Sequence, residues 1–240
     1  MRTSDIFSQL VYGELSQLSL GRTVDGALDP TNYPAVMAHI NLGLNALYKR
    51  FYLKKGSFDL QLQSGQTLYP LTSVYGVNSR KGREDVRYII DTVANPFEDD
   101  ILKIEKVTTE AGIELGLNDA SDYACATPRA TTLEVNADIV NKLDTLPEEL
   151  KTTNLKLVYR ASHPVIKSAR DDIELPYSYL EPLLLFIASR VHNPIGMTNE
   201  FHAGNSYAKK YEMACQQLEA YNLSIDQGTL NERLISNGWV

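Results

Sequence analysis

The apolar residues of this 240-residue chain recur at helical spacing near both ends and at every second position in its middle. This change of period constrains the fold more than any single motif does. A stripe of apolar residues with a period of 3.6 is buried by a helix, and one with a period of two is buried by a strand. The chain is therefore predicted to be an α+β protein whose helices come from its first and last thirds.

Two helices are predicted before residue 57. The first spans residues 4–18 and carries Tyr12 near its apolar face, and the second runs from a cap near Asn32 to Gly56. In the second helix the apolar residues recur at steps of three and four. They are Val36, Ile40, Leu44, Leu47, Tyr48 and Phe51.

Two more helices are predicted near the other end. Pro176 suits a first helical position, and that helix should end before the Asn193-Pro194 step. Its apolar stripe, Leu183–Val191, is broad enough to serve both the core and part of a subunit interface. The last helix follows a cap near Thr198, and its apolar face includes Tyr221.

The middle of the chain has the pattern of strands. Residues 57–63 alternate between apolar and polar, and the Ser64-Gly65 step then leads to residues 67–71, which together predict a hairpin. Further strands are predicted at residues 87–91, 101–108, 131–135 and 155–159.

These patterns give the domain organisation. Residues 1–56 and 165–223 are expected to form a helical bundle from the N- and C-terminal helices, with a β-rich insertion at 57–164 and an extended C-terminal tail at 224–240. An insertion of this kind costs little when the chain leaves and returns at nearly one place.

The composition excludes several classes of protein. Two cysteines, Cys125 and Cys215, imply no disulfide framework. Cys215 is interpreted as a small core residue and Cys125 as a packing residue of a loop or strand. The most apolar run is far shorter than the roughly 20 residues of a membrane helix, and residues 1–5 lack the apolar core of a signal peptide. We therefore expect a soluble, cytoplasmic protein that contacts no membrane.

The charge argues against tight nucleic-acid binding. The net charge is −7 and the sequence pI is about 5.2, whereas such binding normally needs a basic patch that neutralises phosphates. The basic cluster of Arg80, Lys81 and Arg83 is followed directly by Glu84 and Asp85, which is typical of a solvated loop. Any contact with DNA is expected to be passing and not adhesive.

A search for catalytic residues finds no convergent set. His192, Glu200 and His202 are the best candidates for a metal site, but their spacing differs from the one-turn spacing of a helical zinc pair. Capping or solvated side chains are the simpler interpretation. Neither a nucleophile motif nor a phosphate-binding glycine loop occurs. The sequence thus predicts a protein that is not an enzyme, with no catalytic, cofactor-binding or metal residues and no cofactor.

Tyrosine and the end of the chain point instead to interfaces. The chain has fourteen tyrosines and one tryptophan, and tyrosine is enriched at protein–protein interfaces. The chain finishes with Trp239 and Val240 after a polar stretch. A tryptophan there would supply a buried anchor in the groove of a partner, although a frayed terminus explains it equally well.

Several strings of residues carry a resemblance. They are Ile40–Lys54, Ile101–Thr108 with Gly112–Leu115, Leu157–Pro164, Ile173–Leu180, Arg190–Pro194, and Glu200–Tyr207 with Tyr211-Glu212. These strings resemble the head-to-tail adaptor proteins of tailed bacteriophages, also called connector or head-completion proteins, and together they cover most of the chain. The chain departs from the smaller, mainly helical adaptors in its long middle insertion and its tail.

The resemblance implies a structural virion protein that forms a homo-oligomeric ring of twelve beneath the portal at one capsid vertex. The helical bundle would form the ring wall, the C-terminal segment would dock on the portal protein, and a distal part would receive the tail or nozzle protein. Double-stranded DNA would pass through the bore during ejection without sequence-specific binding. The subunit would be in the host cytoplasm during assembly and in the virion neck afterwards.

Two sets of interface residues are predicted. For portal docking they are Leu234, Ile235, Trp239 and Val240. For contacts with a neighbouring subunit or the tail they are Arg80, Lys81, Arg83, Tyr177 and Tyr179.

Three alternatives remain open. A different virion piece, such as a tail-completion or tail-tube protein, would be told apart by its copy number and its direct neighbour in the particle. A metalloenzyme using His192, Glu200 and His202 would hold stoichiometric metal. A DNA-binding packaging factor would bind duplex in a salt-sensitive way.

Overall fold

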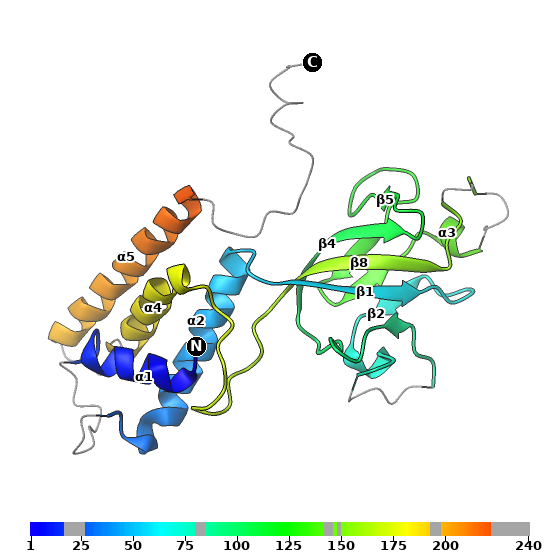
Figure 1. The fold of residues 1–240 in the computed structure, drawn as a ribbon. Coiled ribbons are helices and arrows are strands. Elements are labelled where there is room, and N and C mark those ends of the chain that lie inside the picture. The colour runs from blue at the N-terminus through cyan, green and yellow to red at the C-terminus, as the bar shows by residue number, and fades with distance from the viewer. Residues whose placement is uncertain (17–26, 80–84, 142–145, 148–149, 193–197, 222–240) are drawn as a thin grey trace, which may run out of the picture. The chain divides into compact units, whose positions relative to one another are not determined.

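The chain forms two compact units, one mainly helical and one built of β-strands (Figure 1). The computed structural model describes residues 1–16, 27–79, 85–141, 146–147, 150–192 and 198–221, with the backbone alone over 198–203. The helical unit consists of residues 1–53 and 163–240, and the β unit of residues 54–162. The predicted limits of the insertion, 57 and 164, lie within three residues of these. The α+β fold class predicted from the sequence is confirmed.

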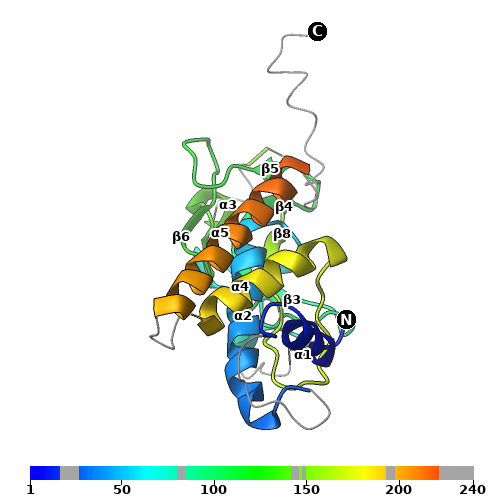
Figure 2. The ribbon, with the colours of Figure 1, turned by 90° about the vertical axis from the view of Figure 1, so that its left-hand side faces the viewer.

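Helix α4 is the central element of the helical unit. The elements of this unit are α1 (Thr3–Tyr12), η1 (Pro30–Asn32), α2 (Tyr33–Arg50), η5 (Tyr177–Tyr179), α4 (Leu180–His192) and α5 (Thr198–Tyr221). Helix α4 contacts α1, α2 and α5, and Figures 1 and 2 show it between α5 and α2. None of the helices in the described ranges is long and apolar enough to cross a lipid bilayer.

Burial on several sides explains the broad apolar stripe of α4. Eleven of its thirteen residues are buried, and within Leu183–Val191 Arg190 alone is exposed. Three helices of the same unit cover this stripe, so the core accounts for its width, and the expectation that part of it serves a subunit interface stays a prediction.

Two tyrosines lie differently from their predicted positions. Tyr12 and Tyr221, expected on apolar faces, are 74% and 71% exposed. Each is the last residue of its helix, where the neighbouring helices no longer cover the side chain. Helix α1 ends earlier than predicted because the backbone of Gly13, with φ of −104° and ψ of −113°, leaves the helical conformation.

The β unit contains two antiparallel sheets. Its elements are β1 (Lys55–Gln61), β2 (Leu68–Pro70), η2 (Ser73–Tyr75), β3 (Ile89–Ile90), β4 (Ile101–Thr109), β5 (Glu114–Leu115), β6 (Ala126–Arg129), β7 (Thr132–Glu134), α3 (Ala137–Asn141) and β8 (Asn154–Ala161). The strand orders are β3-β1-β8-β4-β5 and β2-β7-β6. Alternate residues of β1 are buried, and the apolar residues of both sheets form one core that includes Leu60, Tyr69, Leu133 and Leu157.

The predicted hairpin of residues 57–63 and 67–71 is wrong. Strand β1 uses both of its edges, since it pairs with β8 along its length and with β3 near its end. Strand β2 therefore pairs with β7 in the other sheet. The turn at Gly65, with φ of 78°, redirects the chain from one sheet to the other. The hydroxyl of Tyr69 accepts the N–H of Gln63 at 2.8 Å and holds that turn closed.

The first and last strands of the β unit pair with each other, so the chain enters and leaves it at one place. Gly56 lies opposite Tyr159, and the N–H of Ala161 donates to the carbonyl oxygen of Lys54 at 3.0 Å. The Tyr159 ring covers Gly56 so closely that a Cβ there would overlap it. The Tyr159 hydroxyl donates to the carboxylate of Asp100 at 2.9 Å. Burial raises the pKa of both groups of this pair.

Candidate interaction surface

Of the predicted interface residues, the structure describes the two tyrosines alone. The others, Leu234, Ile235, Trp239, Val240, Arg80, Lys81 and Arg83, lie outside the described residues. Tyr177 is 84% exposed and Tyr179 is 1% exposed. Tyr179 packs edge-on against Phe51 with ring centroids 5.0 Å apart. Tyr179 is thus a core residue of the helical unit, whereas Tyr177 is free to meet a partner.

His192, the described member of the candidate metal set, is a core residue at the end of α4. Its ring stacks on Tyr207 at 5.1 Å, and its Nε2 lies 3.3 Å from the carbonyl oxygen of Glu14. The side chains of Glu200 and His202 lie outside the described part of the chain. Among the side chains that the structure describes, no three His, Cys, Asp or Glu are grouped so as to hold a metal ion.

Both cysteines are free thiols in apolar cores. Cys125 is 1% exposed and Cys215 is 0% exposed. Burial raises the pKa of Cys125 to about 12 and also raises the pKa of Cys215. A reactive cysteine needs the opposite shift, because the thiolate is the nucleophile. The predictions that Cys215 is a core residue and that Cys125 is a packing residue agree with this burial.

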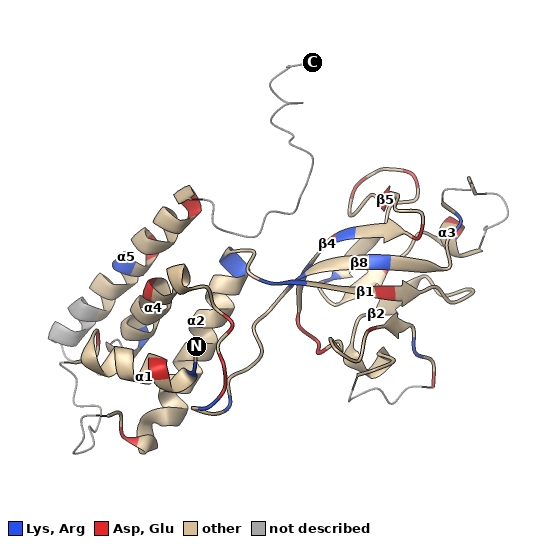
Figure 3. Ribbon diagram, in the orientation of Figure 1, with Lys and Arg blue, Asp and Glu red and all other residues tan. Residues whose placement is uncertain are grey.

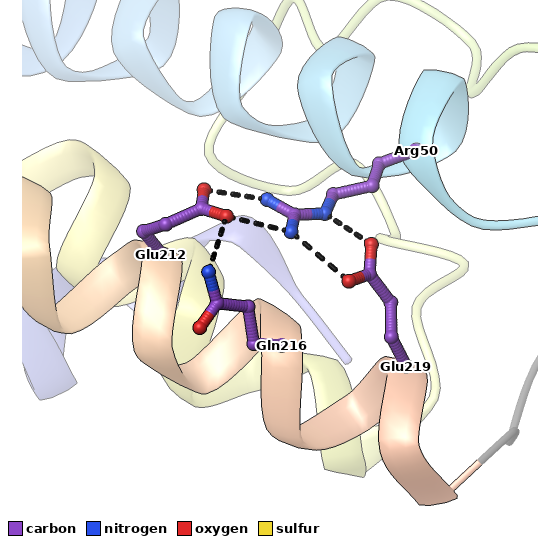
Figure 4. Close-up of polar contacts among 4 residues, drawn as sticks. All are labelled: Arg50, Glu212, Gln216 and Glu219. Atoms are coloured by element: carbon purple, nitrogen blue, oxygen red, sulfur yellow. Dashed lines mark hydrogen bonds and ion pairs between the residues drawn. The ribbon is translucent and has the colours of Figure 1, made fainter.

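A guanidinium joins α2 to α5 (Figure 4). Arg50 donates to Glu212 at 2.7 and 2.8 Å and to Glu219 at 2.6 and 3.2 Å. Gln216 donates to the same Glu212 carboxylate at 3.2 Å. The two carboxylates lie about two turns apart on α5, so one planar guanidinium fixes the outer half of that helix to the end of α2.

A groove of about 550 Å³ opens in the helical unit between the end of α1, the start of α4 and the middle of α5. Its lining residues are Gly13, Glu14, Glu181, Leu185, Tyr207, Lys210, Met213, Ala214 and Gln217. Leu185 is buried, and Met213 is 61% exposed. The groove therefore combines apolar surface with charged side chains from α4, α5 and the turn after α1.

The charges of the groove are unbalanced. Glu14 and Glu181 contribute two carboxylates and Lys210 contributes one ammonium, whose Nζ lies 5.4 Å from the centre of the Tyr207 ring. Among the described residues, Glu14 Oε2 is buried and has no hydrogen-bond partner. Two carboxylates against one ammonium leave the groove with a net negative charge, so it favours a cationic side chain.

The segment from His163 to Glu174 is fixed to α2. The Nε2 of His163 accepts the N–H of Glu174 at 2.9 Å, while its Nδ1 lies 2.6 Å from a backbone carbonyl oxygen and therefore carries the proton. The Tyr48 hydroxyl donates to the carbonyl oxygen of Glu174. The Asn41 side chain donates to the carbonyl oxygen of Ile166 at 2.9 Å and accepts its N–H at 2.8 Å.

Within this segment, residues 165–170 form an exposed tip with a fixed backbone. Val165 is 67% exposed, and Lys167 and Arg170 are exposed. The carboxylate of Asp171 accepts the N–H groups of Lys167 and Ser168 at 2.7 and 3.0 Å. Figure 3 shows basic positions and then acidic ones along this connection. The tip is thus basic and partly apolar.

Sequence reasoning did not single out the groove or the tip. Glu14 lies in the turn after α1, Glu181 in α4 and Lys210 in α5, so no local motif joins them. The tip has the signal of a loop, but nothing in its composition distinguishes it from other loops. Comparison with protein-family models and with curated proteins finds no match.

Proposed function

We propose that this chain is the subunit of a head-to-tail adaptor ring of a tailed bacteriophage. As such it is a structural protein that joins the portal vertex to the tail and lines part of the DNA conduit. The proposal rests mainly on one observation: three of the resembling strings, far apart in sequence, belong to one packed set of helices. Ile40–Lys54 includes the end of α2, Ile173–Leu180 leads into α4, and Glu200–Tyr207 lies in α5. Helix α4 packs against both of the others.

The charge of the chain supports a conduit. Twelve subunits of −7 each carry 12 × −7, or about −84 in total. A wall with the same sign of charge as DNA does not retain phosphates as the genome passes. The partners in this function are the portal protein, the tail or nozzle protein and further copies of the chain, located in the virion neck after assembly in the host cytoplasm.

The decisive experiment images the portal vertex of the assembled particle and locates the subunit in it. A ring of this chain directly beneath the portal is the expected result. A chain found elsewhere in the virion, as a tail-tube or tail-completion protein would be, or missing from the particle, would refute the proposal.

A second experiment tests portal attachment in solution. The purified chain is mixed with portal rings, and co-sedimentation is measured with and without residues 231–240. We expect the native chain to bind and the shortened chain to stay folded but unbound. Stoichiometric zinc or manganese in the purified protein would instead favour the metalloenzyme alternative.

A further inference from the structure

We propose that the acidic groove of one copy binds the basic tip of the next copy, so that subunits join head to tail. The groove is the one lined by Glu14 and Glu181, and the tip is residues 165–170. This inference rests on the proposed ring function and names the two surfaces that build the ring. A ring needs such a heterologous contact, in which two different and complementary patches of each subunit meet.

The chemistry of the two surfaces is complementary. The groove offers two carboxylates against one ammonium. The tip offers exposed Lys167 and Arg170 beside Val165. The apolar lining at Leu185 and Met213 suits the valine, and the carboxylates suit the two cations.

The tip is rigid enough to act as a ligand. Asp171 caps its backbone N–H groups, and Asn41 holds Ile166 from both sides. Because these contacts exist in the single chain, little conformational freedom is lost on binding. The acidic residues Asp171, Asp172 and Glu174 follow the tip, so its positive charge is confined to Lys167 and Arg170.

The positions of the two surfaces exclude a contact between them within one chain. The tip is fastened to the first turn of α1, since the N–H groups of Thr3 and Ser4 donate to the carbonyl oxygens of Asp171 and Ala169 at 3.0 Å. The groove begins at Gly13, past the other end of α1. A helix rises about 1.5 Å per residue, which separates the surfaces by roughly 15 Å. The tip of a chain therefore cannot fill its own groove.

Two charge-reversed variants test this contact. One carries E14K and E181K in the groove, and the other carries K167E and R170E in the tip. Association is measured by sedimentation, both for the free chains at high concentration and as copies bound per portal ring. We expect each variant alone to associate about tenfold more weakly than the native chain, because like charges face each other.

Mixing the two variants gives the sharpest result. In the mixture, the native tip of the first meets the native groove of the second, and the acidic tip of the second meets the basic groove of the first. We expect association to return, whereas a fold damaged by either substitution would not be rescued. The milder pair E14Q and E181Q, checked for native circular dichroism, should weaken association without reversing it.

The outcomes separate this inference from the proposed function. If the chain lies beneath the portal but each variant alone assembles like the native chain, or the mixture is not rescued, the head-to-tail contact is overturned. If the chain is not beneath the portal but the mixture is rescued, the contact stands and the adaptor function falls. A native chain that associates neither free nor on portal rings would overturn the contact.

Discussion

Arg50 on α2 binds Glu212 on α5 through two parallel hydrogen bonds, of 2.7 and 2.8 Å from its Nη1 and Nη2. The same guanidinium also binds Glu219, about two turns further along α5. Because a planar guanidinium matches a carboxylate at two points, this contact fixes the angle between the helices as well as their distance.

Replacing Arg50 by alanine should loosen the end of α5. The Arg50 side chain is 24% exposed, and its two partners are about half exposed, so solvent screens the contact. We expect Arg50→Ala to lower the free energy of unfolding by about 1 kcal/mol, measured by urea titration with circular dichroism. Lys209→Ala, at an exposed position of the same helix, serves as the matched control and should change nothing. Equal stability of the two variants would contradict this role of Arg50.

Acid should weaken the same contact. Hydrogen bonds from Arg50 hold the pKa of Glu212 and of Glu219 below their usual range. A carboxyl with a lower pKa in the folded state stabilises the fold above its ordinary pKa of about 4.3, and this stabilisation is lost as pH falls through the folded pKa. The stability difference between native chain and Arg50→Ala should therefore be full at pH 7 and shrink below about pH 4. A difference unchanged down to pH 3 would rule out this linkage.

His163 and Tyr48 both bind the backbone of Glu174, so their contributions to stability can be measured together. His163→Ala leaves the backbone N–H of Glu174 without its acceptor and should cost about 1–3 kcal/mol. Tyr48→Phe removes the donor to the carbonyl oxygen of Glu174 and should cost about 1 kcal/mol. Because both hold Glu174, the double variant should lose less than the sum of the single losses in thermal unfolding. Strictly additive losses would show that the two contacts act independently.

A methyl group at Gly56 should displace the ring of Tyr159. Gly56→Ala leaves no room for that ring, so its hydrogen bond to Asp100 is lost. We expect the free energy of unfolding to fall by about 1–3 kcal/mol. Unfolding is monitored by the near-ultraviolet circular dichroism of the tyrosines. The overlap is absent when Tyr159 is also replaced by alanine. In that background Gly56→Ala should have little effect, and a full effect there would point to the backbone instead of the ring.

The two thiols should be unreactive in the folded protein. Burial raises the pKa of Cys125 to about 12 and raises that of Cys215, so almost no thiolate exists near pH 8. A disulfide reagent such as 5,5′-dithiobis(2-nitrobenzoate) should label neither cysteine until denaturant is added, when both should react. Rapid labelling of Cys215 in the native state would show that α5 opens readily.

The sequence predicts where helices and strands lie better than it predicts which strands pair. The period of apolar residues locates α2, α4, β1, β4 and β8, because that period depends on burial of one face. Pairing depends on the whole sheet, which is why residues 57–63 and 67–71 carry the signal of a hairpin and yet belong to different sheets.

The candidate site was harder to predict for two physical reasons. Tyr177 and Tyr179 flank a single serine and have the same local signal, yet η5 turns one outward and one into the core. The groove joins Glu14, Glu181 and Lys210 through the packing of three helices, which no spacing in the sequence encodes.

The pairing of β1 with β8 also has a mechanical consequence. The two strands are antiparallel, and their outer ends, Lys55 and Arg160, are partners. Tension that pulls residues 54 and 162 apart would act on the ladder from this end. It would break the hydrogen-bonded pairs one after another and would not shear all of them at once. The Tyr159 ring over Gly56, secured by Asp100, lies at the end of the ladder where such tension acts first.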